Sequence, residues 1–294
     1  MKKKITLNLP EKVKILGISG SPRKKGNTTA MVKYCLEHAE AMGYVETEYL
    51  SLADCKLYPC VGCRKCFGPN APDAPYQCHM HPDDDIRTII PKMVACDGIL
   101  LGFPVYVAGV PSLFRMFHEK CAVFGPMSFS PYACGMRYKA MGVISQGAML
   151  YGGQEINHFR IAETAIHWGA LVSAAWPTRD APMPQSSWIG GMITTIDGKN
   201  VEGNDAWTEA ETQTVPPIQG IRNERTLKNL GRWLAVNAMT MRVGRMAFEQ
   251  AGYAEPEIRA FPKFQGIPKK GTYFEKMVKE GKITPIQPVN NENG

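Results

Sequence analysis

Four cysteines are crowded into one short stretch of this 294-residue chain. Two residues separate Cys60 from Cys63 and Cys63 from Cys66, and Cys78 follows after a gap of eleven residues. Two-residue spacings allow three thiolates to converge on one metal cluster. The chain has nine cysteines in all, and an odd count argues against a complete disulfide framework. The pattern therefore favours metal, cluster or redox chemistry over structural cross-links.

The residues around this run leave several chemistries open. Cys78 is the expected fourth ligand of a cluster, and Cys55 is the alternative. A zinc site could instead combine some of the cysteines with His79 or His81. Two of the thiols could form a redox-active disulfide, or the cysteines could hold no metal at all.

A second candidate site follows the first apolar segment, residues 13–18. The next residues form a loop of small, hydroxyl and basic side chains that leads into a helix near Thr28. Backbone N–H groups at a helix start, together with hydroxyl groups, can surround a phosphate. Neither a Walker loop nor a Gly-x-Gly-x-x-Gly dinucleotide motif is present. We therefore interpret this loop as a phosphate site, against the simpler interpretation of a capped turn.

The apolar periodicity predicts elements that would position both sites. Strands are predicted at residues 13–18, 44–50, 97–102, 140–144 and 170–175. Helices are predicted at residues 28–42, 83–94, 111–124, 153–168 and 218–250. This alternation predicts an α/β fold with a doubly wound, five-stranded parallel sheet in flavodoxin-like order. Ligands of such sheets bind beyond the carboxyl ends of the strands, here at loops 19–27, 103–110 and 145–154.

The predicted domain organisation has four parts. Residues 1–175 form the core and carry a Cys-rich loop at 55–82. Residues 176–217 are a long insertion that could act as a lid, and residues 218–250 are a C-terminal helix of the core. Residues 251–294 are a C-terminal extension.

The composition excludes several classes of protein. A hydrophobic content of 44% and a charged content of 21% are globular values. The net charge of +7 is scattered, which suits anionic small molecules but indicates no nucleic acid. No apolar run is long enough to span a bilayer and no signal-peptide core follows Lys2–Lys4, so we expect a cytoplasmic protein without a membrane partner.

Three loops carry a resemblance to a known family. The segment Gly17–Arg23, followed by Gly26–Thr28, resembles the opening of the NADPH-dependent FMN reductase family. Gly102–Tyr106 resembles the second flavin loop of that family, and Ser145–Gly147 with Gly152–Glu155 resembles the third. The resemblance implies a flavodoxin-like fold, non-covalent FMN, and electron transfer from NAD(P)H to small acceptors.

The resemblance also implies roles for individual residues. The FMN phosphate would be held by Ser19, Ser21, Arg23, Asn27 and Thr28. The isoalloxazine ring would lie along Pro104, Val105 and Tyr106. The ring edge would approach Ser145, Gln146 and Gly147, with Gly152 and Gly153 in the same loop.

The cysteine run resembles one branch of this family, the iron–sulfur flavoproteins, which carry a [4Fe–4S] cluster beside FMN. The acidic stretch Asp83–Asp85 resembles that branch as well. The resemblance implies that the cluster ligands are Cys60, Cys63, Cys66 and Cys78. This chain departs from the branch in the longer gap before Cys78.

Two functions follow from these expectations. The first is an enzyme that passes electrons from NAD(P)H or ferredoxin to a quinone-like or other small-molecule acceptor. The second is a flavodoxin-like electron carrier without a substrate of its own. The insertion and the extension favour the enzyme because they could enclose a pocket over the flavin. Their Trp and Pro residues also lead us to expect a homodimer or homotetramer.

Overall fold

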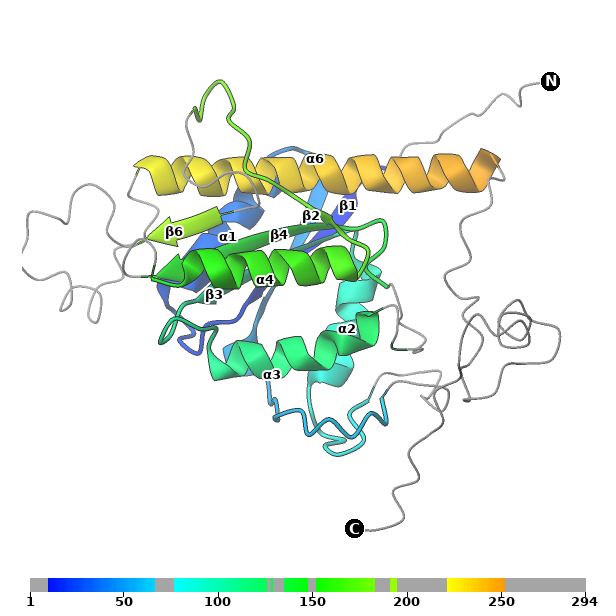
Figure 1. Ribbon diagram of the computed structural model, residues 1–294. Coiled ribbons are helices and arrows are strands. Elements are labelled where there is room, and N and C mark those ends of the chain that lie inside the picture. The colour runs from blue at the N-terminus through cyan, green and yellow to red at the C-terminus, as the bar shows by residue number, and fades with distance from the viewer. Residues whose placement is uncertain are drawn as a thin grey trace, which may run out of the picture.

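The computed structural model describes residues 10–66, 77–125, 128, 135–147, 152–182, 191–194 and 221–251. A parallel sheet with the strand order β2-β1-β3-β4-β5 forms its centre (Figure 1). The strands are β1 (Val13–Ser19), β2 (Val45–Ser51), β3 (Gly98–Pro104), β4 (Ala140–Gly147), β5 (Leu171–Val172) and β6 (Gly191–Thr194). The predicted doubly wound, flavodoxin-like α/β fold is confirmed.

The middle strand β3 explains why the sheet is parallel and covered on both faces. All seven of its residues are buried, as expected for a strand that has helices above and below it. It pairs with β1 from Gly98 and with β4 through to Pro104, which aligns with Gln146. The carboxyl ends of β1, β3 and β4 therefore lie at one edge of the sheet.

The fifth position of the sheet differs from the prediction. The expected strand 170–175 is reduced to β5, which pairs only with the beginning of β4. The short strand β6 lies inside the predicted insertion 176–217 and pairs in parallel with the end of β4, from Ile144 to Gly147. Two short strands, β5 and β6, therefore pair with β4 where a single strand was predicted.

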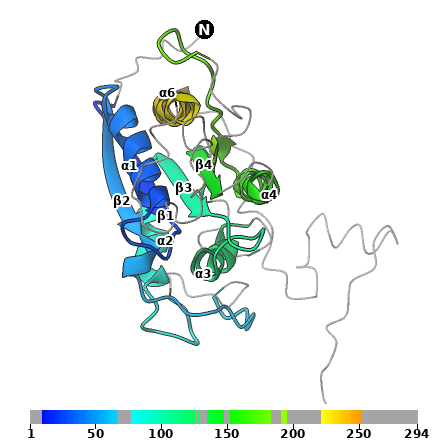
Figure 2. The same ribbon diagram turned by 90° about the vertical axis from the view of Figure 1, so that its left-hand side faces the viewer.

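In the part of the chain that the structure describes, five α-helices cover the two faces of the sheet. They are α1 (Asn27–Glu40), α2 (Ile86–Ala95), α3 (Ser112–Lys120), α4 (Gln154–His167) and α6 (Ile221–Ala251). Short 3₁₀ turns follow β2 at Leu52–Asp54 and α3 at Cys121–Phe124. Figure 2 shows α6 above the sheet and α3 below it. Among the described residues, no helix has both the length and the apolar character needed to cross a membrane.

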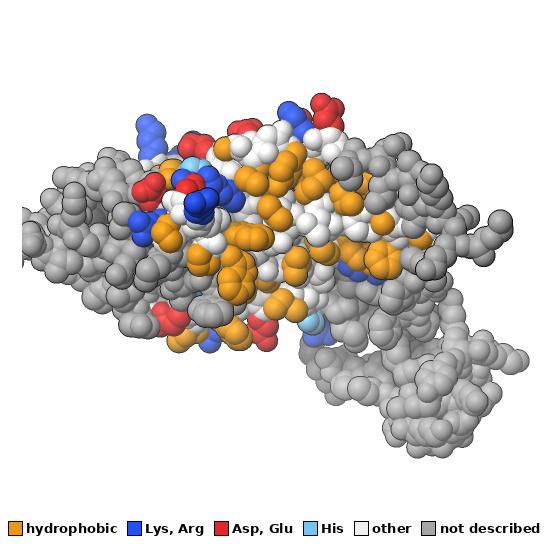
Figure 3. All heavy atoms as spheres, turned by 90° about the horizontal axis from the view of Figure 1, so that it is seen from above, with side chains coloured by type: hydrophobic (Ala, Val, Ile, Leu, Met, Phe, Trp, Pro, Cys, Tyr) orange, Lys and Arg blue, Asp and Glu red, His pale blue; other side chains and the backbone are white. Residues whose placement is uncertain are grey.

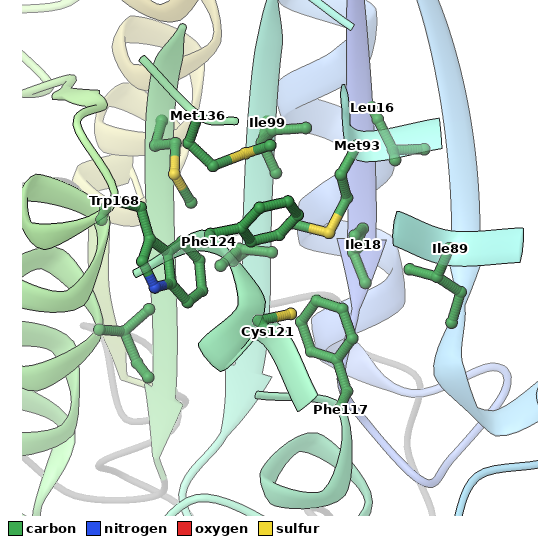
Figure 4. Packing of buried hydrophobic residues seen from close by; sticks show 14 of the residues in the cluster. Leu16, Ile18, Ile89, Met93, Ile99, Phe117, Cys121, Phe124, Met136 and Trp168 are labelled. Atoms are coloured by element: carbon green, nitrogen blue, oxygen red, sulfur yellow. The ribbon is translucent and has the colours of Figure 1, made fainter. Parts of the chain in front are cut away.

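The face covered by α2, α3 and α4 holds the larger hydrophobic cluster. Figure 4 shows Phe117, Phe124 and Trp168 packed beneath the sheet residues Ile18 and Ile99. The half-buried side chains of Cys66 and Cys78 pack against the same cluster. Two of the expected cluster ligands are thus anchored to the core.

The other face holds a close crossing of α1 and α6. A Cβ atom added at Gly231 would lie 2.2 Å from the backbone oxygen of Cys35. The Cys35 thiol donates a hydrogen bond of 3.1 Å to the Leu227 carbonyl, and burial raises its pKa well above the usual range. The missing side chain at Gly231 is what allows the two helices to approach this closely.

This crossing generates a stability prediction with an internal control. Gly231→Ala should destabilise the fold by about 1–3 kcal/mol because the clashing atoms are backbone and cannot move aside cheaply. Gly244 lies on the same helix with open space at its Cβ position, so Gly244→Ala should stabilise by up to about 1 kcal/mol. Urea unfolding of both variants measures the difference, and equal effects of the two substitutions would contradict the close crossing.

Candidate functional site

The three predicted ligand loops meet at the carboxyl edge of the sheet. The Gly20 N–H donates to the Gly102 carbonyl at 2.7 Å, which joins the first loop to the end of β3. The Val105 N–H donates to the Gln146 carbonyl at 2.7 Å, which joins the second loop to the end of β4. The structure therefore brings together loops that are about 80 and 40 residues apart in sequence, as parallel topology requires.

The first loop ends at a helix terminus that is open to an anion. Gly26 is the N-cap of α1 and makes no side-chain capping bond, and the first turn carries no acidic residue. The loop is shaped by a turn in which the Gly26 N–H donates to the Arg23 carbonyl and the Arg23 N–H donates to the Ser21 hydroxyl, both at 3.1 Å. The N–H groups of a helix start attract anions such as phosphate.

The hydroxyl groups near this terminus divide into two sets. The Ser19 and Thr29 hydroxyls share a hydrogen bond of 3.3 Å, and the Tyr49 hydroxyl donates to Thr29 at 3.1 Å. Ser19 is completely buried, so its hydroxyl serves the contact between β1 and α1. Thr28, in the first turn of α1, makes no hydrogen bond with the side chains of the described residues. Sequence analysis did not single out Thr29 or Tyr49, because their pairing joins separate elements.

The second loop is a strained hairpin. Tyr106 and Gly109 exchange two backbone hydrogen bonds, of 2.8 and 2.9 Å, around the two-residue turn formed by Val107 and Ala108. Both turn residues have positive φ, 48° and 57°, a region that is unfavourable for a β-branched residue such as valine. The Val107 side chain is fully exposed, and Tyr106 is 40% exposed. Backbone strain of this kind is concentrated at ligand sites.

The third loop supports that hairpin from the other side. The Asn157 side-chain amide donates to the Ala108 carbonyl at 2.8 Å and to the Gly153 carbonyl at 2.7 Å. Gly153 has a φ of 107°, and a Cβ atom there would lie 2.8 Å from the Ala108 oxygen. A glycine is therefore required where the two loops touch. Asn157 escaped sequence analysis because only the folded chain shows its partner.

Ser145, at the end of β4, is held by a buried histidine. Its hydroxyl and Nδ1 of His158 are 3.1 Å apart, and neither residue is exposed to solvent. His158 belongs to helix α4. The structure gives it the task of orienting Ser145, whose expected position is at the ring edge. Residues 148–151 of this loop lie outside the described part of the chain.

These groups fit a flavin mononucleotide in their chemistry. An uncapped helix terminus beside a free hydroxyl suits the phosphate. An apolar hairpin next to backbone donors suits a flat ring whose redox properties are tuned at its polar edge.

Hydrogen bonds join the segment that leads to Cys60 and the segment that follows Cys78. We call these two segments the arms of the cysteine loop. The Lys56 N–H donates to the Asp85 carboxylate at 2.7 Å, and the Asp85 N–H returns a bond of 2.9 Å to the Lys56 carbonyl. The Tyr58 N–H donates to the Asp84 carboxylate at 3.0 Å, and the Tyr58 ring stacks on His81 with centroids 4.1 Å apart. We call residues 56–58 and 81–85 the clasp. Figure 1 shows the described cysteine segments below α3.

The clasp corrects the predicted helix 83–94. Helix α2 begins at Ile86, and the three aspartates remain outside it. Asp84 is completely buried, and its Oδ1 atom accepts a hydrogen bond of 2.8 Å from the Ile86 N–H. The acidic stretch thus starts the helix and also holds the chain segment that leads to Cys60.

Three of the predicted ligands act electrostatically on one lysine, Lys120. Burial lowers the pKa of Lys120, and three thiol groups lie close enough to raise it when they are charged. These thiols belong to Cys78, Cys60 and Cys66. Cys63 is exposed, and positive φ values at Gly62 and Arg64 bend the chain on either side of it.

The donor set fits an iron–sulfur cluster in its chemistry. In the described part of the chain none of the four cysteines is joined in a disulfide, and thiolates are the ligands that such clusters require. In the described part of the chain, no three Cys, His, Asp or Glu side chains already lie in a metal-holding arrangement. Most of the segment that joins Cys66 to Cys78, residues 67–76, is outside that part.

Cys55 differs from the four cysteines of the run. Its thiol donates a hydrogen bond of 3.4 Å to the Ser51 carbonyl. Burial raises its pKa, with a further contribution from the charge of Asp85, so its thiolate is disfavoured. The geometry therefore favours Cys78 over Cys55 as a fourth ligand.

Together the fold and the three loops define a flavodoxin-like flavoprotein with a cysteine-rich arm. The sequence profile of the NADPH-dependent FMN reductase family matches residues 13–177, which is more than half of the chain. The chain belongs to this family, and its relatives place it in the iron–sulfur flavoprotein branch.

Two relatives and one solved structure illustrate this position. An iron–sulfur flavoprotein of Methanosarcina thermophila is 32% identical over 203 residues, which cover 69% of this chain and 87% of that protein. One of Methanocaldococcus jannaschii is 39% identical over 145 residues, which cover 49% of this chain and 66% of the relative, just under two thirds. RosB, solved with a bound riboflavin-phosphate intermediate, shares the fold with a TM-score of 0.52 and 15% identity, covering 96% of this chain and 93% of RosB.

The phosphate loop generates a binding prediction. Thr28→Val should weaken FMN binding by about 1–3 kcal/mol, the cost of losing a hydrogen bond to a charged group. Thr28→Ser keeps the hydroxyl and should bind FMN nearly as well as the parent protein. Fluorescence titration of the apoprotein measures all three affinities. Unchanged affinity in Thr28→Val would place the phosphate elsewhere.

Proposed function

We propose that this protein is an FMN-dependent oxidoreductase that also carries a [4Fe–4S] cluster on Cys60, Cys63, Cys66 and Cys78. It passes electrons from NAD(P)H or ferredoxin to a quinone-like or other small acceptor. Family membership supports FMN as the flavin, and the names of the relatives support an iron–sulfur group. The donor, the acceptor and the cluster are our proposals.

The arrangement of α3 is the observation that carries this proposal. The helix begins at Ser112, three residues after the strained hairpin. It ends at Lys120, on whose pKa the charges of three cysteines act. Its nine residues span roughly 13 Å at 1.5 Å per residue. One short helix thus connects the candidate flavin loop with the candidate cluster arm.

Different residues of the chain would serve the flavin site and the cluster site. The open terminus of α1 and the Thr28 hydroxyl bind the phosphate, and Asn157 and His158 hold the second and third loops in place. When bound, FMN supplies the conversion between hydride transfer and single-electron transfer. The clasp keeps the cysteine arms together at the side of the core.

Anaerobic reconstitution with iron, sulfide and FMN tests the proposal. The parent protein should contain FMN rather than FAD, together with iron and acid-labile sulfide, and it should oxidise NADH or NADPH. Cys60→Ser, Cys63→Ser, Cys66→Ser and Cys78→Ser should each lose iron and keep FMN, because the flavin loops lie on other strand ends. Cys55→Ser is the matched control and should keep its iron, since its thiol is engaged with Ser51.

Several results would overturn parts of this proposal. Bound FAD would contradict the single phosphate site. Parent protein without iron after reconstitution would leave an FMN reductase without a cluster. Iron retained in Cys78→Ser and lost in Cys55→Ser would exchange the fourth ligand. Absence of NAD(P)H oxidation by fully loaded protein would favour ferredoxin as the donor or an electron carrier without a substrate.

We also propose that the protein forms a homodimer or homotetramer. Exposed apolar side chains lie on one side of α4 at Ile156, Phe159 and Ile166. Figure 3 shows hydrophobic side chains gathered on the side that bears α6, where a pocket is lined in part by Met42, Trp233 and Val236. Contiguous apolar surface of this kind marks interaction sites.

Light scattering at micromolar concentration checks the oligomeric state. We expect a mass of two or four times 32.5 kDa. Phe159→Glu should shift the mass toward the monomer if α4 contributes to the interface. A parent protein that is monomeric across the concentration range would contradict the proposal.

A further inference from the structure

Lys120 occupies an unusual position for a lysine. It is the last residue of α3, and its side chain is only 3% exposed. Lysines are almost never buried to this degree unless they are paired. On the same face of the helix, Phe114 and Phe117 pack into the hydrophobic cluster. A charged group therefore stands where the helical period calls for an apolar one.

Its partner is the completely buried Asp84 of the clasp. The Lys120 ammonium donates to Oδ2 of Asp84, and the same oxygen accepts the Tyr58 N–H. The other oxygen, Oδ1, accepts the Ile86 N–H. Three donors from three segments thus hold this carboxylate, and the ion pair fixes the end of α3 against both arms of the cysteine loop.

The sulfur ligands lie near this end of α3, because Cys66 and Cys78 pack against the hydrophobic cluster that includes Phe117 and Cys121. Cys78, Cys60 and Cys66 are the groups whose negative charge acts on Lys120. The hydrogen-bonding needs of the helix do not explain a lysine here, since α3 ends in backbone bonds from Cys121.

We propose that Lys120 is a positioning residue for the cysteine-held cluster, where its ammonium, anchored by Asp84, compensates the negative charge of the sulfur ligands. The inference rests on the proposed function, because it requires the cluster. Lys120 lies outside the cysteine motif, and its role is to determine how readily the cluster is built and reduced.

The physical consequence concerns the reduction equilibrium. Four thiolates around an iron–sulfur core leave the site anionic, and one-electron reduction adds a further negative charge without forming or breaking a bond. Net charge and hydrogen bonds to sulfur set the potentials of such clusters. Loss of a nearby buried positive charge should therefore make the cluster harder to reduce, and the effect is larger than for a solvated charge.

The experiment compares Lys120→Met, Lys120→Gln and Lys120→Arg in full-length protein reconstituted anaerobically. The readouts are iron and acid-labile sulfide per FMN, and the cluster midpoint potential from dithionite titration followed by EPR. Lys120→Gln is included because its amide can still donate to Asp84 if the methionine variant does not fold. Lys92→Met is the matched control, since Lys92 on α2 forms an exposed ion pair with Glu48 of β2.

We expect the neutral variants either to lose iron while keeping FMN or to show a more negative midpoint. The reduction equilibrium constant should fall about tenfold, which is about 59 mV for a one-electron couple. Lys120→Arg should recover much of the change, and Lys92→Met should behave like the parent. If both neutral variants have the iron content and midpoint potential of the parent, only the proposed role of Lys120 is overturned. A parent protein that takes up no iron would instead overturn the proposed function.

Discussion

Parallel pairing of β3 with β1 on one side and β4 on the other is the constraint on which the rest of the structure depends. It brings the ends of three strands to one edge, where Gly102 aligns with Ser19 and Pro104 with Gln146. Each loop then supplies a different chemistry: a helix terminus for an anion, a strained apolar hairpin, and a serine held by a buried histidine. None of these loops could form a site alone.

The cysteine arm depends on a second constraint, the burial of Asp84 with Lys120. A buried ion pair is weak evidence for stability, because removing two charges from water costs about as much as their attraction returns. Here the pair has a more specific consequence. It joins α3 to both arms of the cysteine loop, so the segment bearing Cys60 and the segment bearing Cys78 meet beside the core.

Much of this arrangement could be predicted from the sequence, and the failures have physical causes. Among the described residues, apolar periodicity located every α-helix to within a few residues, and small residues after strand ends located the three loops. The split fifth strand could not be predicted, because β6 has no local signal and exists through its pairing with β4. The hairpin turn could not be predicted either, since Val107 and Ala108 stand where such turns usually have an Asn-Gly pair.

The residues that sequence analysis missed are those that join elements. Thr29 and Asn157 act through partners that are distant in sequence, and the composition does not reveal those partners. Lys120 is the exception, because helical spacing from Phe114 and Phe117 places it on the apolar face of α3. A lysine at such a position was a visible signal that a buried anionic partner must exist.

We propose that one chain holds a flavin and a cluster at opposite ends of α3. An anaerobic reductive titration tests it most directly, because it counts the electrons that the reconstituted protein accepts per FMN. We expect about three electrons, two for the flavin and one for the cluster. A plateau at about two electrons, with the spectrum of flavin alone, would contradict it.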